Sequence, residues 1–154
     1  MRSRESLRQL TRIESLKAVR EKRAHAALRL ALSRHEELAR RLVEIADAID
    51  ATERERHALF EQHSGLMTRG GLYQLKRRES VLESRRIDLM LDHAEIESSL
   101  AQAQLAAQRA RESLASARRE KNKIECAADL FRQEINLQSR IYEEHEIEER
   151  RHEH

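Results

Sequence analysis

The sequence predicts an all-α fold: a long two-helix antiparallel coiled-coil hairpin with an overhanging C-terminal helix. Three observations predict it. The 154 residues include no proline, and the only three glycines lie close together near the middle of the chain. Charged residues make up 38% of the chain and aromatic residues only 3%. Apolar residues recur at heptad spacing, whereas a sheet fold would need turn residues every ten or so positions. Sheet folds are therefore excluded.

The glycines mark the one expected break in the helical pattern. Gly65 follows Ser64 and predicts a glycine cap in the left-handed conformation at the end of the first helix. Gly70 and Gly71 predict the turn before the second helix. We therefore expect one hairpin domain over 1–154, with helix 1 at about 5–64, the turn at about 65–71 and helix 2 at about 72–150. Two helices joined by so short a loop pack antiparallel.

A heptad seam runs along both halves. Steps of three and four residues from Leu72 to His145 meet 22 positions, of which sixteen are apolar. In the first half the same rule runs from Ala24 to Leu66, while Leu10, Ile13 and Leu16 lie upstream and out of phase with it. An insertion of four, a stutter, would repair the phase. The larger predicted seam residues are Leu28, Leu38, Leu42, Ile45, Ile49, Leu59, Leu82, Leu89, Ile96, Leu100, Leu114, Ile124 and Phe131.

The turn position also predicts which residues face each other. If the turn is centred near residue 68, the numbers of facing residues add up to about 136. The N-terminus then faces roughly residue 135, and residues 136–154 have no partner within the chain.

The sequence offers no basis for catalysis, a cofactor or a metal. A two-helix hairpin has no concave pocket, and no phosphate loop, nucleophile motif or zinc motif is present. Cys126 falls at a solvent-facing heptad position. The spacing of His145, His152 and His154 does not match helical metal pairs. No apolar stretch approaches the length of a membrane span and no signal core follows Met1, so we expect a cytoplasmic protein that does not insert into membranes.

The charge is unevenly distributed although the net charge is only +2. Residues 1–41 carry a net charge of +7 and residues 143–154 a net charge of −4. Both signs oppose the helix dipole, so helix stability does not explain them. Attraction between the two helices is one explanation. An end of the hairpin that docks into another protein is the interpretation we favour.

A second basic cluster lies near the expected turn. The sequence Arg69-Gly70-Gly71 is most simply part of the turn, and Lys76, Arg77 and Arg78 follow it, with Arg85 and Arg86 about two turns later. These side chains form a candidate contact at the hairpin tip, made of Arg69, Lys76, Arg77 and Arg78. The alternative is a solvated helix face paired with Glu79 and Glu83. Both readings stay open at this stage.

The opening of the chain resembles a known family. Residues 10–24 read L-x-x-I-x-x-L-x-x-V-R-x-x-R-A, and together with the length and proline-free layout they are similar to the YscO/FliJ class of stalk proteins in type III secretion and flagellar export. The resemblance implies a helical rod whose terminal end enters the hexameric export ATPase and couples it to the export gate protein, with export chaperones as further partners. The residues it implies at the ATPase are Arg2, Arg4, Arg8, Arg12, Arg20, Arg23, Glu143, Glu144 and Glu146. Tyr73 and Tyr142 lie far apart, so no gate-binding tyrosine cluster can be carried over.

The sequence thus favours a non-enzymatic central stalk at the cytoplasmic face of a secretion apparatus, with no cofactor. One alternative is an RNA-binding helical arm, which the near-neutral charge and the scarcity of stacking aromatics disfavour; no nucleic acid is therefore expected as a partner. The other is a coiled-coil scaffold or chaperone escort that docks a partner helix on residues 136–154.

Overall fold

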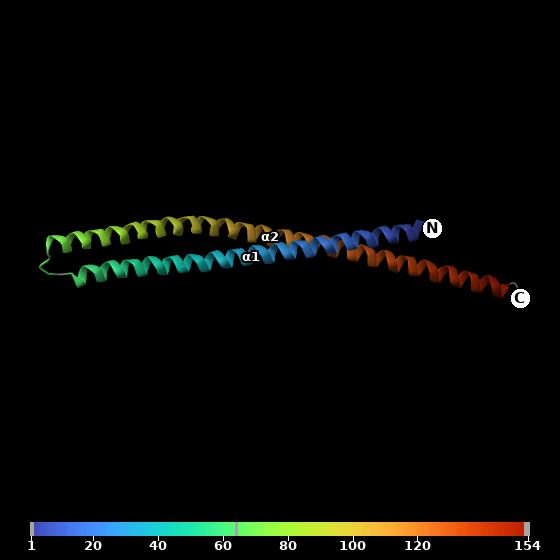
Figure 1. Ribbon diagram of the computed structural model, residues 1–154. Helices are drawn as coiled ribbons and strands as arrows, with labels where there is room; N and C mark the ends of the chain where they lie inside the picture. The colour runs from blue at the N-terminus through green and yellow to red at the C-terminus, as the bar shows by residue number, and fades with distance from the viewer. Residues whose placement is uncertain (1, 64, 153–154) are drawn as a thin grey trace. The chain divides into compact units, whose positions relative to one another are not determined.

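The computed structural model describes residues 2–63 and 65–152, and these ranges contain two helices and no strand. Helix α1 runs Arg2–Gln62 and helix α2 runs Arg69–His152 (Figure 1). The two helices are antiparallel and packed against each other. The predicted all-α helical hairpin is confirmed.

Two compact units make up the chain. Unit 1 contains Met1–Arg29 and Arg109–His154, and unit 2 contains Leu30–Gln108. Each unit is a pair of antiparallel helix segments, one from α1 and one from α2. The sequence predicted a single hairpin domain over 1–154. That single-domain assignment stays a prediction.

The core of unit 2 is a row of apolar side chains between its two helix segments. Leu38, Ile96 and Ala103 are buried together. The partly buried residues packed against them are Leu42, Ile45 and Leu100. Leu59 and Leu75 are buried nearer the turn. All of these residues occupy heptad positions named from the sequence, because steps of three and four keep one face of a helix toward its partner.

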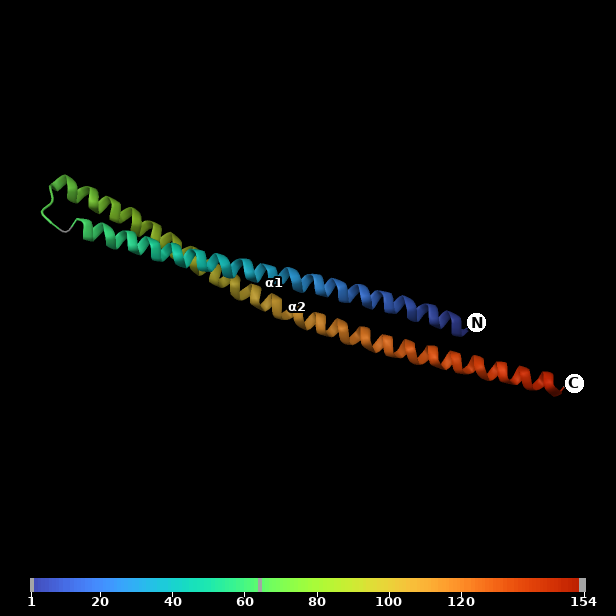
Figure 2. The same ribbon diagram turned by 90° about the horizontal axis from the view of Figure 1, so that it is seen from below.

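In unit 1 the seam of α2 continues through Leu114 and Ala128, which are buried, to Ile135, which is half-buried. Every described residue from 136 to 152 is exposed. The last part of α2 extends beyond the first residues of α1 (Figure 2). The overhang expected from the position of the turn is therefore present.

The start of α1 departs from the prediction. We expected Leu10, Ile13 and Leu16 to lie out of phase and a stutter to follow them. Instead, the partly buried positions continue the register of Ala24 without a break through Leu7, Leu10, Glu14, Lys17 and Glu21. Ile13 and Leu16 are exposed. The uninterrupted register places charged residues in the seam, and each of the three pairs with a residue of α2, as described below.

The turn also differs from the prediction. Thr68 caps α2: its Oγ1 accepts a hydrogen bond from the Gly71 amide at 3.2 Å, and its carbonyl accepts one from the Leu72 amide at 3.0 Å. Gly70 and Gly71 consequently lie inside the first turn of α2, which begins at Arg69 and not at residue 72.

The end of α1 is closed without the predicted glycine cap. No glycine with positive φ occurs among the described residues. The His63 amide donates to the carbonyl of Phe60 at 3.3 Å, and His63 Nδ1 lies 2.9 Å from the carbonyl oxygen of Leu59. The last carbonyls of α1 thus find hydrogen-bond partners in the His63 amide and side chain, so a glycine in the left-handed conformation is not needed to end the helix.

We expect Gly70→Ala to raise the free energy of unfolding by roughly 0.5–1 kcal/mol, because glycine is the poorer helix former. A Cβ atom at Gly70 meets nothing within 4 Å. Urea denaturation followed by circular dichroism measures the change. Gly71→Ala is the matched control: its Cβ would lie 3.2 Å from Thr68 Oγ1 and press on the cap, so it should gain less or lose stability. A loss of stability in Gly70→Ala would contradict a helix start at Arg69.

Candidate functional site

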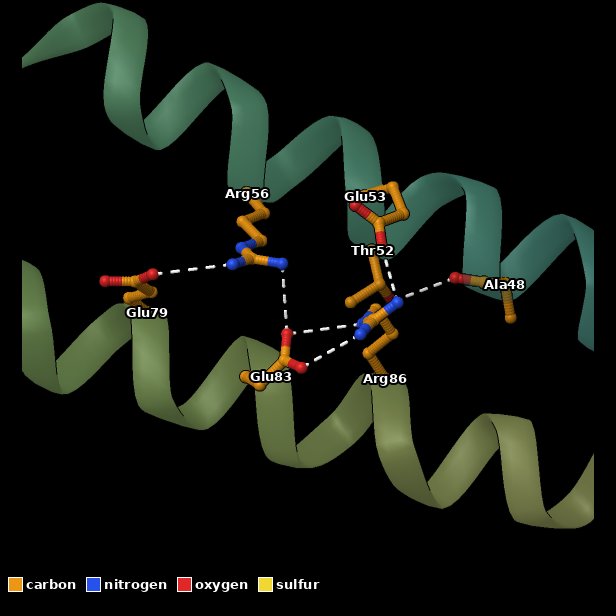
Figure 3. A network of polar contacts seen from close by, with 7 residues as sticks. All are labelled: Ala48, Thr52, Glu53, Arg56, Glu79, Glu83 and Arg86. Atoms are coloured by element: carbon orange, nitrogen blue, oxygen red, sulfur yellow. Dashed lines mark hydrogen bonds and ion pairs between the residues drawn. The ribbon is translucent and has the colours of Figure 1, made fainter.

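A polar network interrupts the apolar seam of unit 2 (Figure 3). Arg56 of α1 lies 3.5 Å from Glu79 and 3.1 Å from Glu83, both on α2. Arg86 of α2 lies 2.9 Å from Glu83 and 3.2 Å from Glu53 of α1. The network therefore links the two helices through two arginines and three carboxylates.

Thr52 of α1 lies beside this network (Figure 3). Its side chain is buried, and its hydroxyl donates to the carbonyl of Ala48 at 2.8 Å within α1. A buried hydroxyl without a partner would be costly, so the bond to the preceding turn makes threonine acceptable in the seam.

The network also shifts the charge equilibria of its members. A hydrogen bond from Arg86, together with the positive charges of Arg86 and Arg56, lowers the pKa of Glu83, although partial burial acts in the opposite direction. The hydrogen bond to Glu83 and its negative charge raise the pKa of Arg86. Arg86 is therefore paired with glutamates of both helices and is not part of a tip contact.

The four predicted tip residues have a different environment. Arg69, Lys76, Arg77 and Arg78 are all exposed, and no ion pair joins them to another described residue. Arg77 and Arg78 border an open groove of about 610 Å³. Leu59, Val81 and Leu82 form its apolar part, and Glu55 and Gln74 complete the lining. The tip of unit 2 therefore presents exposed cations beside a groove that is partly apolar and also contains one carboxylate.

Unit 1 contains a second set of charged contacts across the seam. Lys17 Nζ lies 2.6 Å from a carboxylate oxygen of Glu120. Glu21 lies 2.9 Å from Lys121 and 3.4 Å from Arg118. Arg132 also pairs with Glu14, at 3.0 Å. These pairs join the two helices in the part of the hairpin in which α1 supplies few apolar seam residues.

The same contacts shift pKa values in unit 1. The hydrogen bond from Lys121 is the main cause that lowers the pKa of Glu21, and Arg118 adds to it. The hydrogen bond from Lys17 lowers the pKa of Glu120, with a smaller effect from the charge of Arg20. The hydrogen bond to Glu21 raises the pKa of Lys121. All of these shifts favour the charged forms that the cross-helix pairs require.

The predicted ATPase-facing residues lie on the surface of unit 1. The exposed members are Arg4, Arg8, Arg12, Arg20, Arg23, Glu143, Glu144 and Glu146. The side chain of Arg2 lies outside the described residues. No ion pair joins the described arginine side chains of this set to its glutamates. The basic and acidic groups therefore share one unit without neutralising each other.

The acidic block is not the very end of α2. Arg150, Arg151 and His152 occupy the last turn, where positive charge favours the helix dipole. Glu5 lies in the first turn of α1, where negative charge is favourable. Both ends are mixed, because Arg4 also lies in the first turn of α1 and Glu149 also lies in the last turn of α2.

Neither a cluster of metal ligands nor a membrane-spanning helix is found among the described residues. Within residues 2–63 and 65–152, no group of three or more His, Cys, Asp or Glu side chains is placed to hold a metal ion. Cys126 is exposed, and His154 lies outside the described residues. None of the described helical segments combines the length and apolar character that a membrane span needs.

The cross-helix ion pairs are the contacts that sequence analysis missed. At the start of α1 the apolar residues Leu10, Ile13 and Leu16 alone were used to place the seam, so the charged seam positions there were not predicted. The signal that could have found them is charge complementarity between facing positions. Lys17 and Glu120 lie close to the register that the position of the turn predicts.

The fold of this chain is similar to that of a known secretion protein. Compared with the 2.8 Å crystal structure of the type III secretion protein YscO from Vibrio parahaemolyticus, the chain has a TM-score of 0.80 and 21% sequence identity. The match covers 96% of each chain. No family model and no curated protein matches the sequence. The resemblance inferred from residues 10–24 is therefore confirmed at the level of the fold.

Acid should weaken the hairpin as the pH falls below about 4.5, the ordinary pKa of a glutamate. The folded-state pKa values of Glu21, Glu83 and Glu120 are lowered, so their stabilising effect is present above the unfolded-state pKa and is lost as the pH falls through the folded-state values. The measurement is the free energy of unfolding by urea at steps between about pH 6 and pH 3.

Glu83→Gln tests the origin of this pH dependence. The variant lacks one of the three titrating groups, so its stability should fall less over the same interval than that of the unmodified chain. Glu112→Gln is the control, because Glu112 is exposed and no ion pair joins it to another described residue. An unchanged acid dependence in Glu83→Gln would show that the network does not contribute to it.

Proposed function

We propose that this chain is the central stalk of the export ATPase in a type III secretion apparatus, acting at the cytoplasmic face without catalysis of its own. The fold similarity to YscO over 96% of both chains is the observation that carries this proposal. The surface of the hairpin supports it, because both candidate contacts are exposed side chains on a helical pair and not groups converging in a closed pocket.

Unit 1 supplies the end that enters the ATPase ring. Its arginines on α1 and its glutamates on the overhang of α2 have no ion-pair partners among each other, so they are available to charges on ATPase subunits. Two unlike helices in a sixfold ring contact the subunits unequally. Such differential contacts can shift individual subunits between conformations and so promote turnover.

Unit 2 supplies the contact to the export gate. The exposed cations Arg69, Lys76, Arg77 and Arg78 lie at the tip, beside the groove lined by Val81 and Leu82. A partner with an acidic surface and an apolar side chain would complement both features. Export chaperones are a further class of partner that could use the same tip.

Stimulation of the hexameric export ATPase of the same organism tests this proposal. The purified chain should bind the ATPase at low salt and raise its rate of ATP hydrolysis. The triple variant Arg4→Glu, Arg8→Glu and Arg12→Glu should lower the stimulation by about tenfold or more, because like charges then oppose each other at the contact.

A matched variant reverses the same number of charges in unit 2. Lys76→Glu, Arg77→Glu and Arg78→Glu should leave ATPase stimulation intact and weaken binding to the gate protein. If the unmodified chain neither binds nor stimulates the ATPase at low salt, the stalk function is wrong. If the chain instead captures RNA with a steep salt dependence, the helical-arm function replaces it.

A further inference from the structure

Two rows of side chains in unit 1 are left outside the seam. The α1 row consists of Ile13, Leu16, Arg20 and Arg23, and the α2 row consists of Leu137, Ile141, Glu144 and Glu148. All eight are exposed, including 63% of Leu16 and 60% of Leu137. Each row therefore begins with two apolar residues and ends with two charged ones.

The α1 row lies on one side of the seam, and the α2 row continues the same heptad positions of α2 into the overhang. With the seam at heptad positions a and d, their members take positions c and g, and the g positions of two antiparallel helices flank one edge of their seam. The ion pairs agree with this arrangement. Lys17, at a d position, pairs with Glu120 at a g position. Glu14, at an a position, instead pairs with Arg132 at an e position, on the opposite side.

The charges at the ends of the rows are not neutralised within the chain. No ion pair joins Arg20, Arg23, Glu144 or Glu148 to another described residue. Arg20 lies near enough to Glu120 to act on it electrostatically, but that carboxylate is bound to Lys17. The α1 row thus offers positive charge and the α2 row offers negative charge.

We propose that these two rows of unit 1 bind a second copy of the chain. The two copies are related by a two-fold axis, and the α2 row of each copy packs along the α1 row of the other. The apolar residues of one row then cover those of the other, and glutamates meet arginines. Because the contact is isologous, it forms twice in the dimer.

The direction and spacing of the rows support this pairing. A two-fold axis across the hairpin sets α2 of one copy parallel to α1 of the other, because the two helices of a chain are antiparallel. Both rows change from apolar to charged in the direction of increasing residue number. Their members are separated by steps of three and four residues, so the rows span nearly equal lengths of helix.

A second copy fits the two rows better than an anionic membrane does. A membrane surface would attract Arg20 and Arg23 but repel the glutamates of the α2 row. The surface is complementary to itself. The dimer contact would also cover residues of unit 1 that the proposed function assigns to the ATPase. On that proposed function, the dimer is the form of the free protein, and binding to the ATPase separates the two copies.

Charge reversal in two separate variants tests the pairing. Arg20→Glu with Arg23→Glu makes the α1 row acidic, and Glu144→Arg with Glu148→Arg makes the α2 row basic. Each variant alone should dimerise about tenfold or more weakly than the unmodified chain, because like charges then meet at both contacts. An equimolar mixture should form a heterodimer, because every contact in it joins opposite charges. Sedimentation velocity gives the mass, and native mass spectrometry identifies the heterodimer.

The apolar part of the contact has its own control. Leu137→Asp should weaken the dimer, whereas Leu105→Asp, at a residue of α2 that is 54% exposed but lies in unit 2, should not. Circular dichroism verifies that all variants stay helical. The proposal is overturned if the unmodified chain is monomeric at about 100 μM in low salt. It is equally overturned if the mixed variants show no heterodimer. Neither readout involves the ATPase, so the stalk function stands or fails separately.

Discussion

A seam formed by only two helices is the constraint on which the rest of this structure depends. Each helix can cover its partner on one side only, so most seam residues remain partly exposed, and no large side chain among the described residues is fully buried. The buried residues include several alanines, which remove little apolar area from water. The helices are therefore held together by many small contacts distributed along the whole seam and not by one large core.

Such a seam has little means of fixing how the helices align along each other. Similar leucines and alanines recur every three or four residues, so a shift by one heptad would again place apolar residues opposite each other. The charged contacts remove this ambiguity. Arg56 meets two glutamates in unit 2, and Lys17 meets Glu120 in unit 1. A shifted hairpin would lose these ion pairs; each contributes only modestly because its side chains are partly solvated, but together they favour one alignment.

The sequence was sufficient to predict the hairpin. Apolar residues at steps of three and four, such as Leu38, Ile96 and Leu114, fall on one face of a helix, and that face must pack against a partner. It was not sufficient at the start of α1, where Ile13 and Leu16 seemed to mark a second phase. There the ion pairs decide the register, and they depend on residues about a hundred positions away. Gly70 and Gly71 were misplaced for a local reason: Thr68 caps α2 before them. The surface residues were found by charge alone, which indicates exposure but does not identify a partner.

The pairing between Lys17 and Glu120 has a consequence for how such chains diverge. Their contact depends on opposite charges at two facing positions, and it would serve equally with Lys17→Glu and Glu120→Lys together. The pairing of opposite charges at two facing positions can therefore persist while the residue at each position changes. Proteins with this architecture can lose most of their sequence likeness and keep their alignment, and the trace of common descent is to be sought in pairs of positions that change in concert.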